Sequence, residues 1–492
     1  MKKIRITDQT LRDGQQSLWA SRMTTAMMYP VAERLDHIGF EAIDMGGGGQ
    51  SGVTVRFLKE NPWQRMDLMC AKIRRTPWVT AMRSKGGGGF NVVPDDILLL
   101  WIERFVAHGM RQFRLFDPLI DLDNLVFQLK YAKSVGMYTI GALPYSVSPV
   151  HTDELYASKA REFIERAGVD AIMLKDAGGL LTPDRVRTLV PAIKKAIGDV
   201  TLELHTHCTT GLGPLVTLEG VKVGADQIHT SIAPLANGAA QPSMQTTVRN
   251  LRDMGYSVDV DDKLINEVSE HFYKVARQEG KPVGVPAEYD AFQFEHQVPG
   301  GMISHFKLQL AQAGLSHKLD ELLHECARIR KELGWPIMIT PFAQFVGTQA
   351  VLNVVNGERY KIVPDEIKQF ALGYNGKLLA PIDPNVLDKI LAGGSQAIPP
   401  KPSTPEPGVP LLRKKYPNIS DEERLLRYAC AGSQVDEMLA AGPIKTEYRY
   451  DQPLVDMLKD IAMRPKLARV YIEKPDMKIE FRRTAENAAT PP

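Results

Sequence analysis

The sequence has 492 residues, of which 44% are hydrophobic and 24% are charged, as in globular proteins of more than one domain. The formal net charge of +2 gives no reason to expect nucleic acid or an acidic membrane as a partner. No apolar run approaches the ~20 residues that span a bilayer, and MKKIRITDQTLRDG lacks the apolar centre of a signal peptide. The cysteines have no paired spacing, which argues against a disulfide framework and favours the reducing cytoplasm; they are Cys70, Cys208, Cys326 and Cys430.

Short β-rich runs alternate with amphipathic helical stretches in the N-terminal half. The helical patterns include 95–109 and 153–168. Alternating strands and helices predict a parallel sheet, and eight strands close into a (β/α)8 TIM barrel without edges. We therefore expect an α/β barrel over 1–285. The predicted strands are 4–7, 41–45, 78–82, 112–116, 138–143, 170–175, 201–207 and 226–231.

The pattern changes after residue 285, where helical periods continue without regular strands. We expect a mostly helical domain at 286–396, then a linker at 397–410, which is too rich in proline for a helix or strand. A small α/β extension would occupy 411–483, and 484–492 reads as a tail. The extension contains a helical pattern at 418–432 and two alternating runs within 467–483 that predict a strand pair.

Two histidines end the seventh predicted strand, in TLELHTH. His205 and His207 are two residues apart, so on a strand they point to the same face. Neutral imidazole is a favoured ligand of transition metals. The pair alone does not decide between a metal site and a chance spacing.

Other reactive residues follow the ends of neighbouring strands, which is where TIM barrels place their chemistry. Asp13 and Gln16 follow the first strand, Arg83 ends the third, and Lys175 ends the sixth. Two of these residues also have structural explanations that involve no reaction. Asp13 could pair with Arg12 or cap a helix, and Lys175 could form a simple ion pair. A lysine at the end of an apolar strand is less usual, because burial disfavours its charge.

Several motifs together carry a family resemblance. TLRDGQQS with HTH resembles the metal-dependent barrels that include isopropylmalate synthases and hydroxymethylglutaryl-CoA lyases. Further stretches from residue 3 to about 480 closely resemble the carboxyltransferase component of biotin-dependent pyruvate carboxylases, oxaloacetate decarboxylases and transcarboxylases. These stretches are RMTTAMMYPVAERLDHIGFEAID, VRFLKENPWQRM, FRLFDPLIDLDNL, YSVSPVHT, LKDAGGLLTP, QPSMQ, HQVPGGM and ITPFAQFVGTQAVLNV.

The resemblance implies a metal centre and a carboxyl transfer. Metal ligands would be the residues at Asp13, Lys175, His205 and His207, with Lys175 carbamylated by carbon dioxide; the metal would be Zn²⁺, Mn²⁺ or Co²⁺. Gln16 and Arg83 would hold a small oxo acid, because a guanidinium donates two parallel hydrogen bonds to a carboxylate. Carboxybiotin would release carbon dioxide beside the substrate, whose enolate then attacks it.

Three stretches depart from the family pattern. Where the family has GGTSQPSM, this sequence has NGAAQPSM, so Ala239 replaces a threonine thought to shuttle a proton. VWGGATFD becomes MGGGGQSG, with Gly46 in place of tryptophan. LRGQN becomes the start of MRSKGGGGF, which brings Lys85 and a second glycine run. Neutral loop drift is one explanation. We favour an altered substrate, a different or bulkier acid, whose further acidic group Lys85 could bind.

The sequence has no Met-Lys-Met motif, which surrounds the biotinylated lysine of carrier domains. We therefore expect biotin on a separate carrier subunit, a separate biotin carboxylase subunit, and a homo-oligomer of two or more chains. An alternative function is an aldol-type lyase or synthase of the same superfamily, but the LKDAGG motif and the C-terminal domain argue against it. Another is a non-catalytic scaffold that has lost its proton shuttle, but the four retained ligand positions argue against that.

Overall fold

The computed structural model describes residues 1–87, 92–312, 314–450, 457–458, 461, 463–464, 469–474 and 477–482. Eight parallel strands form a closed barrel in sequence order, with the last strand pairing with the first. This confirms the predicted TIM barrel and each of its eight strands. The strands are β1 (Arg5–Asp8), β2 (Ala42–Gly47), β3 (Trp78–Arg83), β4 (Gln112–Phe116), β5 (Tyr138–Pro144), β6 (Ala171–Asp176), β7 (Thr201–Thr206) and β8 (Gln227–Thr230).

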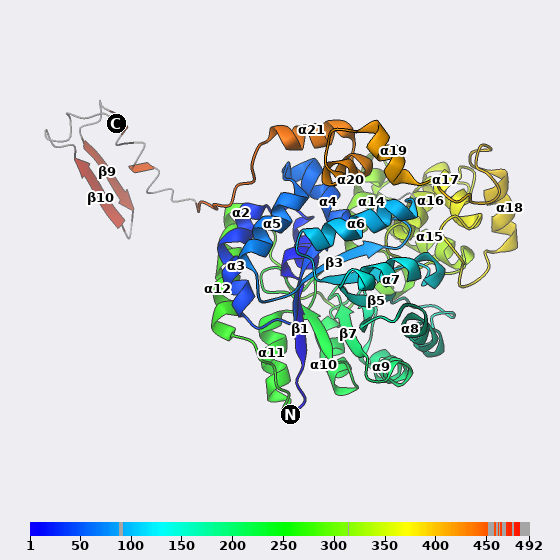
Figure 1. Cartoon of the computed structure of the whole chain (residues 1–492), viewed down its shortest axis with the longest axis horizontal. Coiled ribbons are helices and arrows are strands. Elements are labelled where there is room, and N and C mark those ends of the chain that lie inside the picture. The colour runs from blue at the N-terminus through cyan, green and yellow to red at the C-terminus, as the bar shows by residue number, and fades with distance from the viewer. Residues whose placement is uncertain are drawn as a thin grey trace.

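Helices surround the barrel and bury their apolar sides against the outer faces of the strands (Figure 1). The predicted helical patterns 95–109 and 153–168 correspond to α6 and α8. The helices up to residue 278 are η1 (Thr10–Gly14), α1 (Gln15–Trp19), α2 (Thr25–Met28), η2 (Tyr29–Val31), α3 (Ala32–His37), α4 (Gly48–Val53), η3 (Thr54–Leu58), α5 (Pro62–Lys72), α6 (Asp95–Ala107), η4 (Leu122–Asn124), α7 (Val126–Ser134), α8 (Asp153–Ala167), α9 (Pro183–Ile197), α10 (Gly213–Lys222), α11 (Met244–Asp253) and α12 (Asp262–Gln278).

A second group of helices has its own apolar core, in which Phe342, Ile367 and Ile390 are buried. It follows the barrel in the chain, as the helical pattern after residue 285 predicts. The proposed domain boundaries themselves stay a prediction. The helices are α13 (Phe292–His296), α14 (Gly300–Gln312), η5 (Ser316–Lys318), α15 (Leu319–Glu332), α16 (Phe342–Asn356), α17 (Asp365–Ala371) and α18 (Pro384–Ala392).

The C-terminal part differs from the expectation in two places. Helix α19 (Gly408–Lys415) begins inside the predicted linker, because the Asp96 carboxylate accepts hydrogen bonds from the backbone N–H groups of Gly408 and Val409 at 2.9 and 2.8 Å. Proline at the third position of that helix is tolerated in a first turn. The helix predicted at 418–432 is α20 (Asp421–Ala429), and a further helix that was not predicted, α21 (Gly432–Ala440), follows it.

The predicted strand pair is present as an antiparallel hairpin of β9 (Arg469–Lys474) and β10 (Met477–Arg482). Its turn and the predicted tail at 484–492 lie outside the described residues. The hairpin is drawn apart from the barrel in Figure 1, whereas α19, α20 and α21 lie against the barrel helices. Among the described residues, no helix is both long and apolar enough to cross a bilayer. The four cysteines are free thiols.

Candidate metal centre

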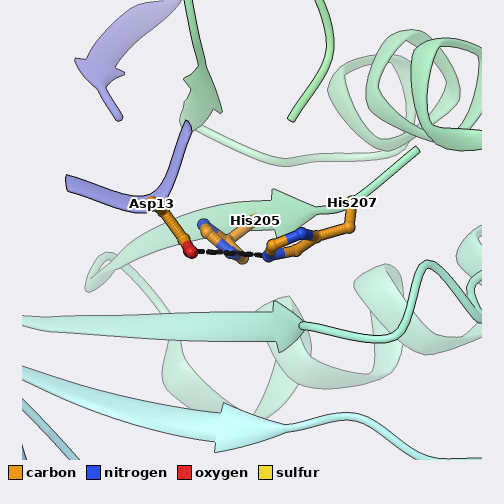
Figure 2. A group of neighbouring side chains, drawn as sticks. All are labelled: Asp13, His205 and His207. Atoms are coloured by element: carbon orange, nitrogen blue, oxygen red, sulfur yellow. Dashed lines mark hydrogen bonds and ion pairs between the residues drawn. The ribbon is translucent and has the colours of Figure 1, made fainter. Parts of the chain in front are cut away.

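Asp13, His205 and His207 meet at the C-terminal end of the barrel strands (Figure 2). Asp13 lies in η1, directly after β1; His205 lies in β7 and His207 just beyond its end. The Nε2 atoms of the two imidazoles are 3.2 Å apart. Asp13 Oδ2 is 3.2 Å from His205 Nε2 and 3.5 Å from His207 Nε2. All three side chains are buried, so these atoms face one another in a largely dry space.

The partner of His207 fixes which of its nitrogens carries the proton. Its Nδ1 lies 2.6 Å from the carbonyl oxygen of Ala239. A carbonyl can only accept, so Nδ1 carries the proton, and Nε2 of the neutral ring presents a lone pair. That lone pair accepts a hydrogen bond from Gln241 Nε2 at 3.0 Å. A bound metal would replace this contact.

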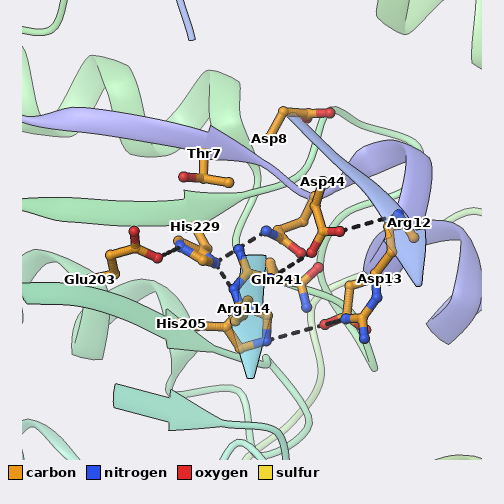
Figure 3. Close-up of polar contacts among 12 residues, drawn as sticks. Thr7, Asp8, Arg12, Asp13, Asp44, Arg114, Glu203, His205, His229 and Gln241 are labelled. Atoms are coloured by element: carbon orange, nitrogen blue, oxygen red, sulfur yellow. Dashed lines mark hydrogen bonds and ion pairs between the residues drawn. The ribbon is translucent and has the colours of Figure 1, made fainter. Parts of the chain in front are cut away.

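His205 is oriented by a chain of buried groups below it (Figure 3). The Glu203 carboxylate lies 3.0 Å from His229 Nε2, which places the His229 proton on that nitrogen. His229 Nδ1 is then an acceptor, 3.0 Å from His205 Nδ1. His205 therefore carries its proton on Nδ1 and presents the Nε2 lone pair toward Asp13. Such carboxylate–histidine chains orient metal-ligating imidazoles in proteins.

Asp13 contributes a negative charge to this space. Burial alone would raise its pKa, but Arg12, whose Nη1 lies 2.8 Å from Asp13 Oδ2, and His207 hold the pKa well below 3.8. The carboxylate is therefore ionised. A carboxylate oxygen and two imidazole lone pairs repel one another unless a cation lies among them. This donor set fits a divalent transition metal.

Lys175 lies beside this group on the neighbouring strand. Its Cα pairs in register with that of His205, so both side chains point to the same face of the barrel wall. Burial lowers the pKa of Lys175 to about 8, although Asp13 opposes this effect. Its Nζ lies 5.3 Å from the centre of the Phe116 ring. Lys175 therefore belongs to the same wall of the barrel as His205, and the charge of Asp13 acts on its amine.

The other predicted site residues lie in three different environments. Arg83 ends β3 and lines a small cavity of about 30 Å³ together with Lys85 and residues of the helical region, including Phe342. Burial lowers the pKa of Arg83 to about 10. Gln16 lies in α1 and is exposed to solvent. Ala239 is at the metal centre, where its carbonyl holds His207. The glycine run after Lys85 lies only partly within the described residues.

Sequence reasoning missed the groups that hold the ligands in place. Glu203 is two residues before His205 on the same strand face, so the period of two could have indicated it. His229 lies inside the eighth predicted strand, and nothing in the local sequence distinguishes it from other strand residues. Arg114 and Asp44 form an ion pair of 2.6 Å inside the barrel, with both side chains buried. These residues give the barrel interior a charged layer beneath the site.

Comparison with known proteins places the chain in a family. A family model described as a conserved carboxylase domain matches residues 294–435, and one described as HMGL-like matches 122–271. A pyruvate carboxylase subunit of Methanocaldococcus jannaschii is 37% identical over 97% of this chain and 84% of its own length. The chain belongs to the carboxyltransferase subunits of biotin-dependent carboxylases.

Other members of the family support this assignment. The methylmalonyl-CoA carboxyltransferase 5S subunit of Propionibacterium freudenreichii is 31% identical over 94% of this chain and 91% of its own length. The carboxyl transferase domain of Rhizobium etli pyruvate carboxylase, solved with oxamate and biotin, has a TM-score of 0.80 and 25% identity over 89% of this chain and 78% of that one. The chain is thus an enzyme component of the carboxyltransferase class, as the resemblance implies, rather than a lyase or a scaffold.

Proposed function

We propose that this carboxyltransferase works through a divalent metal held by Asp13, His205, His207 and a carbamylated Lys175. The observation that carries the proposal is the convergence of two unprotonated imidazole nitrogens and an ionised carboxylate in one buried space. Zn²⁺, Mn²⁺ and Co²⁺ all suit such ligands. When bound, the metal would supply a Lewis acid that stabilises negative charge on the substrate oxygen.

Carbamylation of Lys175 follows from its surroundings. A pKa of about 8 leaves about a tenth of the amine uncharged at pH 7, far more than for an ordinary lysine, and only the uncharged amine attacks carbon dioxide. The product is an anion with two oxygen atoms, so a buried cation is exchanged for a metal ligand. Its position in register with His205 supports this role.

We further propose that Arg83 and Gln16 hold the carboxylate end of a 2-oxo acid. The guanidinium suits a carboxylate, and the exposed Gln16 can approach a substrate that enters from solvent. Lys85 lines the same cavity as Arg83, so the two cations favour an acid with a second acidic group. One relative of the chain is the 2-oxoglutarate carboxylase large subunit of Hydrogenobacter thermophilus, which is 33% identical over 80% of this chain and 61% of its own length.

A proton must still leave the substrate, and the residue at the family's shuttle position cannot take it, because Ala239 has no polar side-chain atom. Cys208 is a poor replacement, because it is buried and burial raises the pKa of its thiol well above 9. The proposal is therefore that pyruvate is a weak substrate and that another acid is the natural one.

The carboxyl group would come from biotin on a separate carrier subunit, loaded by a separate biotin carboxylase, and the chain would act as a homo-oligomer. Two archaeal relatives are named as single subunits of a pyruvate carboxylase, which supports a multi-subunit enzyme. Avidin blotting of the isolated chain is expected to be negative. A positive band would contradict a separate carrier.

The proposal is tested first by metal content. The variant His207→Ala removes one ligand at the barrel mouth and should lose most of the bound metal and most of the carboxyl transfer, while circular dichroism stays that of the folded barrel. Elemental analysis of the purified variant measures the loss. A metal content equal to that of the unmodified chain would contradict the assigned site.

The substrate is tested with carrier and biotin carboxylase supplied. Pyruvate and 2-oxoglutarate are offered separately, and the rate of carboxylation is followed by incorporation of labelled bicarbonate. The proposal expects a higher kcat/KM for the dicarboxylic acid. Equal or greater efficiency with pyruvate would overturn the altered substrate while leaving the metal site standing.

A further inference from the structure

Gln50 carries a buried amide that has no partner. Its side chain is 8% exposed, and among the described residues neither the amide oxygen nor the amide nitrogen has a hydrogen-bond partner. Neighbouring polar side chains are satisfied: the Ser51 hydroxyl donates to the carbonyl of Gly47, and the Thr54 hydroxyl donates to that of Gln50. Two unpaired polar atoms in one buried side chain destabilise the folded chain, which calls for an explanation.

The missing side chain at Gly46 creates the space for this amide. A Cβ atom at Gly46 would lie 2.3 Å from Gln50 Oε1, and Gly46 has a φ of +143°, which other residues rarely adopt. The carboxyltransferases that the sequence resembles have tryptophan there. The Gln50 side chain therefore folds back over the end of β2, in space that a side chain at 46 would fill.

This amide lies on the reactive face of the barrel. Helix α4, which carries Gln50, directly follows the C-terminal end of β2. The same strand packs against η1, the segment that holds Asp13. Glycine at 46–49 places no side chain on this turn, so none of these four residues covers the amide with a side chain.

The chemistry of the two orphaned atoms selects the ligand. A primary amide presents an acceptor and a donor side by side, so a ligand that satisfies both must present a donor and an acceptor on one edge. The ionised 2-oxo acid offers acceptors alone and would leave Gln50 Oε1 unpaired. The ureido ring of biotin has an N–H next to a C=O and matches the amide with two parallel hydrogen bonds.

We propose that Gln50 binds the ureido ring of biotin through this pair of hydrogen bonds. The inference rests on the biotin-dependent function of the chain. Only one of the two ureido nitrogens carries the carboxyl group. The other N–H and the ring C=O are unchanged by the transfer, so one amide can bind both biotin and carboxybiotin. Gln50 is then a binding residue for the carrier's cofactor, which leaves Arg83 and Lys85 for the acid.

The test uses the variant Gln50→Leu, which keeps the size of the side chain and removes both polar atoms. Its binding of biocytin is compared with that of the unmodified chain by ligand-observed NMR, which detects millimolar affinities. The expected result is a Kd for biocytin at least tenfold higher, with an unchanged KM for the 2-oxo acid. An unchanged Kd, or no biocytin binding by either chain, would overturn the proposal.

Thermal stability supplies a second readout with a defined sign. Because the amide is unpaired without biotin, Gln50→Leu should raise the melting temperature by about 2 °C. The matched control is Gln15→Leu, since Gln15 is also buried but donates to the Leu11 carbonyl at 3.2 Å and accepts from the Met23 N–H at 3.3 Å. That control should lower the melting temperature. A fall in Gln50→Leu as well would show an ordinary structural amide.

Failure of this inference is distinguishable from failure of the proposed function. Metal content and the carboxylation rate of the unmodified chain report on the function, whereas the Kd of Gln50→Leu for biocytin reports on Gln50. If the unmodified chain binds metal and is active, but Gln50→Leu leaves the Kd for biocytin unchanged, only the proposed role of Gln50 is rejected.

Discussion

Replacing Glu203 by glutamine should weaken metal binding although Glu203 touches no metal ligand. Glu203 accepts from His229 Nε2 at 3.0 Å and from Gln227 Nε2 at 3.3 Å. Glutamine has only one acceptor. If its oxygen stays with Gln227, its NH₂ group faces His229, and the proton moves to His229 Nδ1. His205 must then carry its proton on Nε2, the atom that should bind the metal.

The size of the effect follows from this change of tautomer. Loss of such a supporting partner typically costs 10- to 100-fold in metal affinity, or about 1.4 to 2.8 kcal/mol. Competition with a chromophoric chelator measures the dissociation constant. The His207 side of the site should be unaffected, since its Nδ1 is held by the backbone carbonyl of Ala239.

A double variant separates the tautomer from the lost charge. In Glu203→Gln with Gln227→Met, no donor competes for the glutamine oxygen, which is then available to accept from His229. Metal affinity should recover in part, although the negative charge is still missing. An affinity unchanged in the single variant, or a loss equally large in the double variant, would refute the reasoning.

Three further predictions concern the shuttle position, the barrel interior and the response to acid. Ala239→Thr should raise pyruvate carboxylation, by up to the ~10²–10⁴-fold that a general acid–base group contributes; an unchanged rate in the coupled assay would argue against a missing shuttle. Arg114→Met should lower the free energy of unfolding by about 3–5 kcal/mol, because it removes the guanidinium that pairs with the buried Asp44 carboxylate; urea titration measures the loss, and adding Asp44→Leu should restore much of it. Burial, with a smaller effect of Arg330, lowers the pKa of His151 from 6.5 to about 3, so the unfolded chain takes up this proton first as the pH falls. The contribution of the neutral His151 to the free energy of unfolding is fully present above pH 6.5. It should fall by up to ~1.4 kcal/mol per pH unit between about pH 6 and 4. Urea midpoints should show a weaker pH dependence in His151→Gln, and equal slopes would reject this source.

The parts of the fold that follow from local patterns were predictable. Each barrel strand is a short β-rich run, and the order of strands and helices defines a closed parallel sheet. The position of His205 and His207 at a strand end likewise predicts a shared site. Lys175 was recognisable because a lysine at the end of an apolar strand needs a reason.

The parts that depend on distant residues were not predictable. Helix α19 begins in a proline-rich stretch because Asp96 of α6 caps it, and no local pattern shows that partner. The tautomer of His205 depends on Glu203 through His229, which requires the closed barrel to bring β7 and β8 together. The orphaned amide of Gln50 is visible only when the contacts of every buried atom are known.

The packing of the C-terminal helices on α6 also has a consequence for how the chain folds during synthesis. Leu412, Leu425 and Leu426 belong to the apolar core of the barrel, yet the first of them is made about 130 residues after α12, the last barrel helix, ends at Gln278. At ~5–20 residues per second, the ribosome needs about 7–27 s to reach it after the barrel strands and helices are made. For that interval the barrel exposes the apolar patch that these leucines later cover. The nascent chain should therefore require a chaperone at this stage, and chains that stop before residue 408 should aggregate even though every barrel strand is present.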